Sequence, residues 1–227
     1  MTTTWTNGAT PSQTFWDRIA RKYAAAPVRN QEAYEKTLAL TLEHLGPDDA
    51  VLELGCGTGT TALLLAGNVS AYLATDFAPG MIRIAEEKLA DEKNKGTAPE
   101  GLRFAVADIH DEQIASAGEG AGGYDAILAF NFLHLVEDPD NLLARVNGLL
   151  KPGGLFISKS ACLKKRAWLF APLVKILQLL GKAPFVRMLS FRALEEMIEH
   201  AGFEIVETGT YPAPFSRFVV ARKPGGR

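Results

Sequence analysis

The chain has 227 residues, of which 47% are hydrophobic and 22% are charged, and its formal net charge is -2. This length and composition are typical of one soluble folded domain and exclude wholesale disorder. A net charge so close to zero provides no field to hold a polyanion, so we expect no nucleic-acid partner.

The cysteines and the N-terminal residues indicate the cellular compartment. Cys56 and Cys162 are the two cysteines, and they make neither a disulfide framework nor a metal-ligand spacing. The first ten residues lack the basic start and the apolar core of a signal peptide. We therefore expect a cytoplasmic protein without a metal site.

Two helices are expected ahead of the first strand. An apolar pattern at helical spacing ends at Pro27, and a second helical stretch runs from about 31 to 44. Helical patterns also separate the strands, and Asp138 is placed to cap a helix that begins at Pro139. Short apolar runs bounded by turn residues predict strands at 50–54, 71–75, 102–107, 124–130 and 155–158.

Alternating strands and helices predict a parallel sheet with helices on both faces. After residue 160 this alternation stops, and it resumes with a helix and with strands near 203–207 and 215–221. The last two strands are joined by a connection too short for a helical crossover, so they should pair antiparallel. We expect an α/β fold with a doubly wound, mostly parallel seven-stranded sheet and an antiparallel last strand.

Three glycines, Gly55, Gly57 and Gly59, alternate directly after the first strand. Ligands of open parallel sheets bind outside the carboxyl ends of the strands, and glycines let a ligand approach bare main chain. Asp76 ends the second strand, where a carboxylate can accept both hydroxyls of a ribose, and Asp108 ends the third, where it can meet an adenine amino group. Together these residues indicate a nucleoside pocket.

The order and spacing of five signatures resemble those of class I S-adenosylmethionine-dependent methyltransferases. The resemblance covers about residues 14 to 160 well, and the N-terminal helix is similar to that of the branch that methylates small molecules and quinones. It implies a Rossmann-like methyltransferase fold with S-adenosylmethionine as cofactor and S-adenosylhomocysteine as product. The signatures are 53–59, Asp76, 106–109, 124–128 and 150–154, with 15–23 in the N-terminal helix.

The resemblance also implies a role for each matching residue. Gly55, Cys56 and Gly57 would border the methionine moiety, while Glu53 would order the loop and reach the cofactor's amino group through water. Asp76 would hold the ribose hydroxyls. The other implied cofactor residues are Gly59 in the loop, Phe77 and Met81 beside the adenine, Asp108 and the Ile109 backbone at its edge, Phe130 and Asn131 near the sulfonium, and Tyr23 above the pocket.

Several of these residues also have a purely structural interpretation. Phe77 and Met81 at helical spacing can belong to the core, Asp108 can cap the next helix, and Tyr23 can simply pack. Residues 57–62 satisfy G-x-G-x-x-A, so a nicotinamide-dependent oxidoreductase is an alternative, although the register of the first glycine weighs against it. A non-catalytic module that binds S-adenosylmethionine for regulation is another.

The chemistry requires few side chains, because a sulfonium methyl group is already electrophilic and the protein chiefly aligns the acceptor. His134, after the fourth strand, is the only plausible general base, and it can equally well serve packing alone. Motifs for methylation of adenine, glutamine, cytosine or arginine are absent from the sequence. We therefore expect in-line transfer to O, N or C of a small apolar or aromatic molecule.

An apolar segment with basic residues, 164–189, has no counterpart in the expected sheet. It can be a lid helix, an acceptor pocket or a peripheral membrane contact. We interpret 1–227 as a single methyltransferase domain with four parts, and the sequence does not indicate the oligomeric state. The parts are an N-terminal helical cap (1–46), a cofactor-binding core (47–160), an apolar lid or insert (161–190) and a C-terminal helix and strand pair (191–227).

Overall fold

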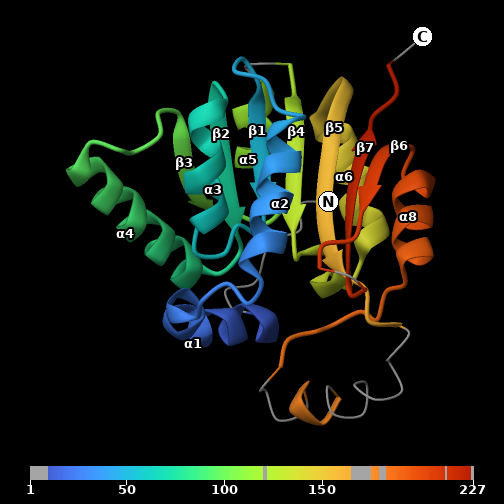
Figure 1. Cartoon of the computed structure of the whole chain (residues 1–227), viewed down its shortest axis with the longest axis horizontal. Helices are drawn as coiled ribbons and strands as arrows, with labels where there is room; N and C mark the ends of the chain where they lie inside the picture. Colours follow the sequence, from blue (N-terminus) through green and yellow to red (C-terminus); the bar gives the residue numbers. More distant parts are fainter. Residues whose placement is uncertain (1–9, 120–121, 165–174, 179–182, 213, 226–227) are drawn as a thin grey trace.

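A single seven-stranded sheet organises the chain in the computed structural model (Figure 1), which describes residues 10–119, 122–164, 175–178, 183–212 and 214–225. The elements are α1 (Pro11–Ala25), α2 (Gln31–Leu42), β1 (Ala50–Leu54), α3 (Thr60–Leu65), η1 (Ala66–Asn68), β2 (Ala71–Asp76), α4 (Pro79–Lys95), β3 (Leu102–Val106), α5 (Glu112–Glu119), β4 (Tyr124–Phe130), η2 (Leu133–Leu135), α6 (Pro139–Leu149), β5 (Leu150–Ala161), α8 (Phe191–His200), β6 (Glu204–Gly209) and β7 (Ser216–Arg222).

The strand order is β3-β2-β1-β4-β5-β7-β6. Strands β1 to β5 are parallel, whereas β7 runs antiparallel to both β5 and β6. This confirms the expected doubly wound sheet with an antiparallel last strand. The chain turns to opposite sides after β1 and β4, so a crevice is expected at the carboxyl ends of these two neighbouring strands.

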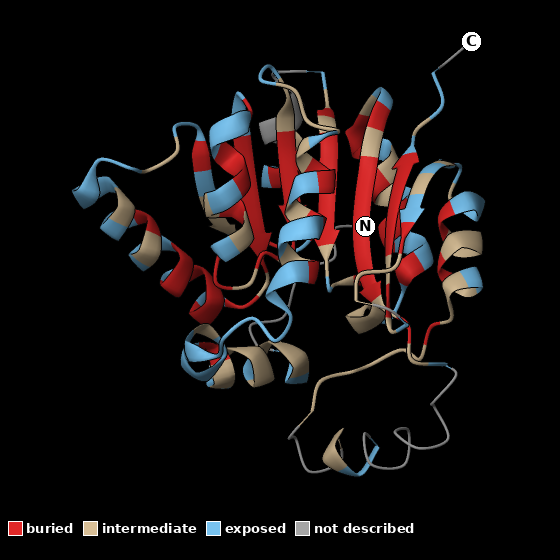
Figure 2. Cartoon of the chain, viewed as in Figure 1, coloured by how far each residue is buried: buried red, intermediate tan, exposed pale blue. Residues whose placement is uncertain are grey.

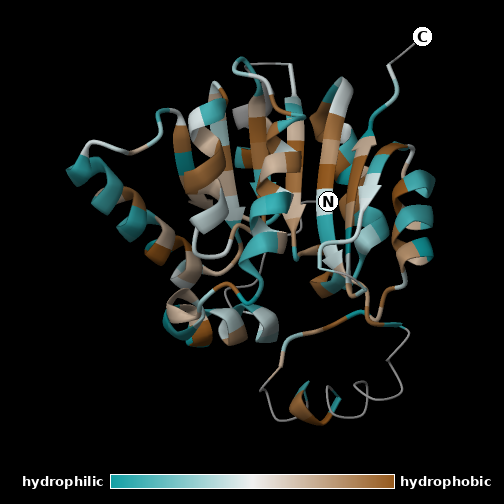
Figure 3. Cartoon of the chain, viewed as in Figure 1, coloured by the Kyte–Doolittle hydropathy of each residue, from teal (hydrophilic) through white to brown (hydrophobic). Residues whose placement is uncertain are grey.

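The central strands are mostly buried (Figure 2) and largely hydrophobic (Figure 3), and two clusters of apolar residues pack on the sheet. On one face, Leu40 of α2 and Leu65 of α3 pack with the strands. On the other, Leu143 of α6 and Ile198 of α8 do the same. The central strands are buried on both sides, as expected for a parallel sheet between helix layers, whereas the edge strands β3 and β6 are partly exposed. The central strands therefore form a rigid platform for the loops at the edge of the sheet.

Most predicted element bounds agree with the structure to within one or two residues, and β5 is the main exception. We predicted a strand at 155–158, but β5 spans Leu150–Ala161. Its extension has tertiary causes: Leu150 pairs with Tyr124 of β4, and the far end pairs with β7 as far as Ala161. Local apolarity does not report such pairing.

Helix α1 lies across the edge of the sheet at which β1, β2 and β4 end (Figure 1). Three residues of α1, each four positions after the one before, hold this helix to Phe77 and α4. The Gln13 amide donates to the Phe77 carbonyl at 2.8 Å, Asp17 accepts from the Gly80 N–H at 2.6 Å, and Arg21 pairs with Glu87. The helix is thus fixed above the carboxyl ends of the strands.

The predicted lid or insert is described in part, because 165–174 and 179–182 lie outside the described residues. Its described end, 183–189, lies against the chain after β4: Arg187 donates from its backbone N–H to the His134 carbonyl and from its guanidinium to the Glu137 carbonyl, both at 2.7 Å. No helix within the described ranges is long and apolar enough to cross a membrane.

Candidate functional site

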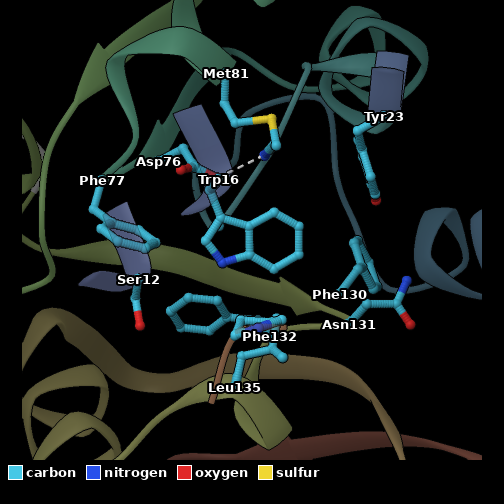
Figure 4. A pocket seen from close by; sticks show the side chains of 13 residues that line it. Ser12, Trp16, Tyr23, Asp76, Phe77, Met81, Phe130, Asn131, Phe132 and Leu135 are labelled. Atoms are coloured by element: carbon cyan, nitrogen blue, oxygen red, sulfur yellow. Dashed lines mark hydrogen bonds between the residues drawn. The ribbon is translucent and has the colours of Figure 1, made fainter. Parts of the chain in front are cut away.

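A cavity of about 100 Å³ lies between α1 and the carboxyl ends of β1, β2 and β4 (Figure 4). We call it the central cavity. Its lining combines bare main chain, aromatic rings and a few polar groups from segments far apart in the sequence. The lining residues are Ser12, Trp16, Tyr23, Gly55, Gly57, Asp76, Phe77, Met81, Phe130, Asn131, Phe132, Leu135 and Pro184.

The glycine loop after β1 contributes two lining residues, Gly55 and Gly57, both in the left-handed region with φ of 66° and 56°. A Cβ on Gly55 would collide with the Phe132 ring, whereas a Cβ on Gly57 would stand 3.8 Å from the Tyr23 ring, in the space of the cavity. Gly59 does not line the cavity. A Cβ there would come within 2.6 Å of the Phe104 ring of β3 and 2.7 Å of the Ala85 methyl group of α4, so this glycine serves close packing at the start of α3.

Asp76 ends β2 and faces the glycine loop across the cavity. One carboxylate oxygen accepts the Gly57 N–H at 3.0 Å, and the other accepts the Ala78 N–H at 2.9 Å. Burial raises the pKa of Asp76 to about 6, although these two N–H groups act to lower it. Each oxygen of a carboxylate can accept a further hydrogen bond, so Asp76 can hold two hydroxyls in addition to ordering the loop.

A smaller recess of about 30 Å³ adjoins the central cavity and shares Gly55, Phe77 and Phe132 with it. Asp108 and Ile109, which follow β3, line this recess as well. Asp108 is exposed and accepts the His110 N–H at 3.0 Å, while its own N–H donates to Asp111. The recess therefore contains a carboxylate and main chain between apolar walls, as the adenine edge would require.

The cap helix α1 contributes an aromatic side chain that the sequence analysis did not assign to the site. Trp16 lies between Met81, Phe77 and Phe132 (Figure 4) and packs edge-on against Tyr23 at 6.1 Å between ring centroids. The seven-residue spacing of Trp16 and Tyr23 places both on one helix face, and this signal was available in the sequence. Ser12 and Pro184 had no comparable local signal.

The end of β4 adds Phe130, Asn131 and Phe132 to the lining. Asn131 is the only non-glycine residue with a positive φ in the described ranges, at 54°, and its N–H donates to the Lys159 carbonyl at 2.6 Å. A left-handed backbone at a non-glycine residue costs free energy and is more frequent at functional sites. Its side chain is exposed at the cavity.

Two predicted cofactor residues, Glu53 and Cys56, are buried but do not line either cavity. Glu53 is 2% exposed and accepts the Tyr72 hydroxyl at 2.8 Å. Burial, with a smaller contribution from the nearby Asp76 carboxylate, raises the pKa of Glu53 to about 7, although the hydrogen bond from Tyr72 acts to lower it. Burial likewise holds the pKa of the Cys56 thiol well above its ordinary value, so Cys56 is not a thiolate nucleophile at neutral pH.

His134, the predicted general base, does not line the central cavity. It lies in η2, and its buried Nδ1 atom has no hydrogen-bond partner. Burial lowers the pKa of His134 to about 4, so the ring is neutral at pH 7 and a weak proton acceptor. We therefore propose no catalytic role for His134.

The residues of the two cavities fit an adenosyl cofactor. Unsubstituted main chain at Gly57 leaves space in the central cavity that a side chain would fill, and Asp76, which lines the same cavity, retains acceptor capacity. Within the described ranges, no group of three or more His, Cys, Asp or Glu side chains is placed to hold a metal ion. The arrangement can bind a nucleoside that carries an attached chain, and it can shield the end of that chain from water.

Comparisons with known proteins agree with this site. Residues 52–156 match the family model described as a methyltransferase domain. A stretch of 129 residues is 35% identical to the hybrid PKS-NRPS synthetase mpsA of Macrophomina phaseolina (strain MS6), covering 55% of this chain and 3% of that synthetase. The chain thus spans a small part of the length of this relative.

Solved structures share the fold over nearly the whole chain. The cyclase SpnF has a TM-score of 0.73 at 18% identity, with 95% of this chain and 97% of that chain covered. Magnesium protoporphyrin IX methyltransferase from Synechocystis PCC 6803 with bound S-adenosylhomocysteine has a TM-score of 0.65 at 19% identity, with 93% and 95% covered.

The strand order defines an open, doubly wound α/β domain, and its glycine loop and acid-ended strands line two cavities that an adenosyl cofactor would fit. The family match is more specific, because residues 52–156 match a methyltransferase domain, in agreement with the class I methyltransferases that the sequence resembles.

Proposed function

We propose that this chain transfers a methyl group from S-adenosylmethionine to a small apolar or aromatic acceptor. The observation that carries the proposal is the junction of the two cavities at Gly55, Phe77 and Phe132, with Asp76 facing it. A nucleoside in the recess would continue into the central cavity, where its attached chain would pass the glycine loop. The family match and the fold support the same conclusion.

In the proposed complex, Asp76 accepts the two ribose hydroxyls, and Asp108 with the Ile109 backbone binds the adenine edge. Phe77 and Met81 pack against the adenosyl group. Gly55 and Gly57 border the methionine part, and Glu53, which precedes the loop in β1 and accepts the Tyr72 hydroxyl, does not line the cavity. The cavity linings support these assignments, which the sequence resemblance implies.

When bound, the cofactor supplies an electrophilic methyl group. The chain itself aligns the acceptor with the methyl group and excludes water. Side chains that are already held in position do this without having to rearrange during the reaction. Trp16, Phe130 and Phe132 form the apolar wall, and Asn131 presents an amide to an acceptor oxygen or nitrogen. Of the side chains that line the central cavity, only Asp76 and Tyr23 are ionisable.

This lining favours acceptors that reach a nucleophilic form without a strong protein base. Phenols and carbon acids flanked by two carbonyl groups are such acceptors, whereas protonated alkylamines are not. Asp76 is engaged by two N–H groups, and burial raises the pKa of Tyr23 further above neutrality. We therefore expect phenolic or enolic acceptors to react faster than amines.

The test uses the purified chain with isotope-labelled S-adenosylmethionine and a panel of phenols, diketones and amines. Labelled product from phenols or diketones is the expected result, and isothermal calorimetry with S-adenosylhomocysteine measures cofactor binding separately. Binding without transfer to any acceptor would instead favour a non-catalytic module, a possibility kept open by SpnF, which shares the fold and is named a cyclase. Failure to bind the product cofactor would overturn the cofactor assignment itself.

A further inference from the structure

A second apolar cavity opens beside the central cavity, between α1 and the described end of the insert. It has a volume of about 230 Å³, and we call it the outer groove. It shares Ser12 and Pro184 with the lining of the central cavity, so the two are neighbours across these residues. Its lining is Pro11, Ser12, Phe15, Glu137, Gln178, Ala183, Pro184 and Phe185.

Both walls of the outer groove are held by hydrogen bonds. On the α1 side, Gln13 and Asp17 tie the helix to the start of α4. On the other side, Arg187 binds the carbonyls of His134 and Glu137, and the Gln178 amide donates to the Pro184 carbonyl at 2.8 Å. Each side of the groove is therefore held in place by its own hydrogen bonds.

The chemistry of the lining is apolar with one acidic group. Phe15, Phe185 and the two prolines provide hydrocarbon surface, and Glu137 is the only ionisable side chain in the lining. The guanidinium groups of Arg18 and Arg187 stack on Phe15 and Phe185 at 5.6 and 6.0 Å from the ring centroids, and neither arginine lines the groove. An anionic group in the groove would meet a carboxylate there, whereas an uncharged chain would bury surface against the rings.

We infer that the outer groove binds the uncharged apolar tail of an elongated methyl acceptor, whose reacting end lies beside Asn131 in the central cavity. This inference rests on the proposed function and adds a substrate class to it. Continuity through Ser12 and Pro184 supports it, because a molecule that extends from the central cavity past these two residues would lie in the groove. A short acceptor would not bury the apolar surface of the groove.

The test measures binding of para-alkylphenols, from para-cresol to para-nonylphenol, by displacement of the fluorescent probe N-phenylnaphthylamine with S-adenosylhomocysteine present. We expect affinity to rise about threefold per added methylene until the groove is filled. A para-alkylphenol whose chain ends in a carboxylate should bind about tenfold more weakly than its methyl ester, and Glu137→Gln should narrow that gap.

Two variants locate the effect. Ala183→Phe, which fills the groove, should weaken para-nonylphenol binding about tenfold and leave para-cresol and S-adenosylhomocysteine binding within twofold. Ala90→Phe is the matched control, since Ala90 is exposed on α4 and lines neither cavity. Should Ala183→Phe fail to fold, Phe185→Ala removes a ring from the same wall and should also weaken only the long chain.

The outcomes separate the two proposals. Affinity that does not depend on chain length, or an equal loss in Ala183→Phe and Ala90→Phe, would overturn the groove while leaving methyl transfer to short phenols intact. Length-dependent binding with no methyl transfer to any phenol would overturn the proposed activity on phenols and leave the groove standing.

Discussion

The cofactor side and the acceptor side of the central cavity are built in different ways. The cofactor side consists of strand ends and the residues directly after them, Gly55, Asp76 and Asp108, which share one edge of a buried sheet. The proposed acceptor side consists of α1, 183–185 and the end of β4 with the chain after it; the sheet positions only the last of these, through Phe130 and the Asn131 N–H. The first is set by strand pairing and the second by a few side-chain hydrogen bonds. We therefore expect changes on the cofactor side to have the larger effects.

The largest effect is expected at Asp76. Asp76→Ala removes the proposed acceptor for both ribose hydroxyls and releases the Gly57 N–H, so affinity for S-adenosylhomocysteine should fall about 100-fold or more. Asp125 is the matched control because it also accepts a backbone N–H, from Ala50 at 2.9 Å, but lies at the opposite end of the sheet. Asp125→Ala should leave affinity within twofold, measured by calorimetry. Equal affinity losses in the two variants would remove the ribose assignment.

The same carboxylate predicts a dependence on pH. The folded-state pKa of Asp76 is about 6, so the carboxylate is protonated progressively as pH falls below that value. Protonation removes acceptor capacity for one hydroxyl, and affinity for S-adenosylhomocysteine should therefore decrease from pH 7 to pH 5. An Asp76→Asn variant should show a flatter profile over this range.

Glu53 is expected to affect stability. Its pKa is about 7 in the folded chain, above the ordinary value of 4.5. The folded state therefore binds the proton more tightly than the unfolded state, and the free energy of unfolding decreases as pH rises from about 4.5 to 7. Glu53→Gln keeps an acceptor for the Tyr72 hydroxyl without the buried charge, and it should stabilise the chain by about 2 kcal/mol at pH 8.

Chemical denaturation of the Glu53→Gln variant at pH 4.5 and pH 8 checks this prediction, since the gain should be nearly absent at the lower pH. A gain of equal size at both pH values would mean that ionisation of Glu53 is not its cause. A carboxylate that lowers stability at neutral pH is expected where function requires it.

The sequence indicated most of the residues that the structure brings together on the proposed cofactor side and few of those on the proposed acceptor side, for physical reasons. Asp76 and Asp108 end apolar runs, and parallel strands bring their carboxyl ends to one edge, so local pattern was enough. The contact between Arg187 and the chain after β4 joins residues 50 apart through carbonyl groups, which no side-chain pattern encodes. Gly59 shows a limit even in a clear motif, because its spacing is shared with ligand-binding glycines while the structure uses it for packing.

A smaller effect is expected where α1 is held above the cavity. Asp17 of α1 accepts the N–H of Gly80 in the first turn of α4. Loss of this hydrogen bond to a charged acceptor would free α1 to move. Asp17→Ala should raise the dissociation rate of S-adenosylhomocysteine about tenfold. Arg21→Ala breaks only an exposed ion pair with Glu87 on the same helix face and should change the rate less than twofold. Stopped-flow tryptophan fluorescence provides the measurement, with Trp5 and Trp168 replaced by Phe so that Trp16 alone reports. Similar rates in the two variants would show that the cap is not held at Asp17.

The smallest effect is expected at Asn131, which joins the two sides. Its backbone is left-handed, a conformation that glycine adopts freely and that costs alanine about 1 kcal/mol. Asn131→Gly should therefore exceed Asn131→Ala in free energy of unfolding by about this amount. Both variants lack the amide, so both should lower methyl transfer equally if that amide contacts the acceptor. Slower methyl transfer in Asn131→Ala alone would instead mean that the backbone conformation at residue 131, and not the amide, affects the reaction.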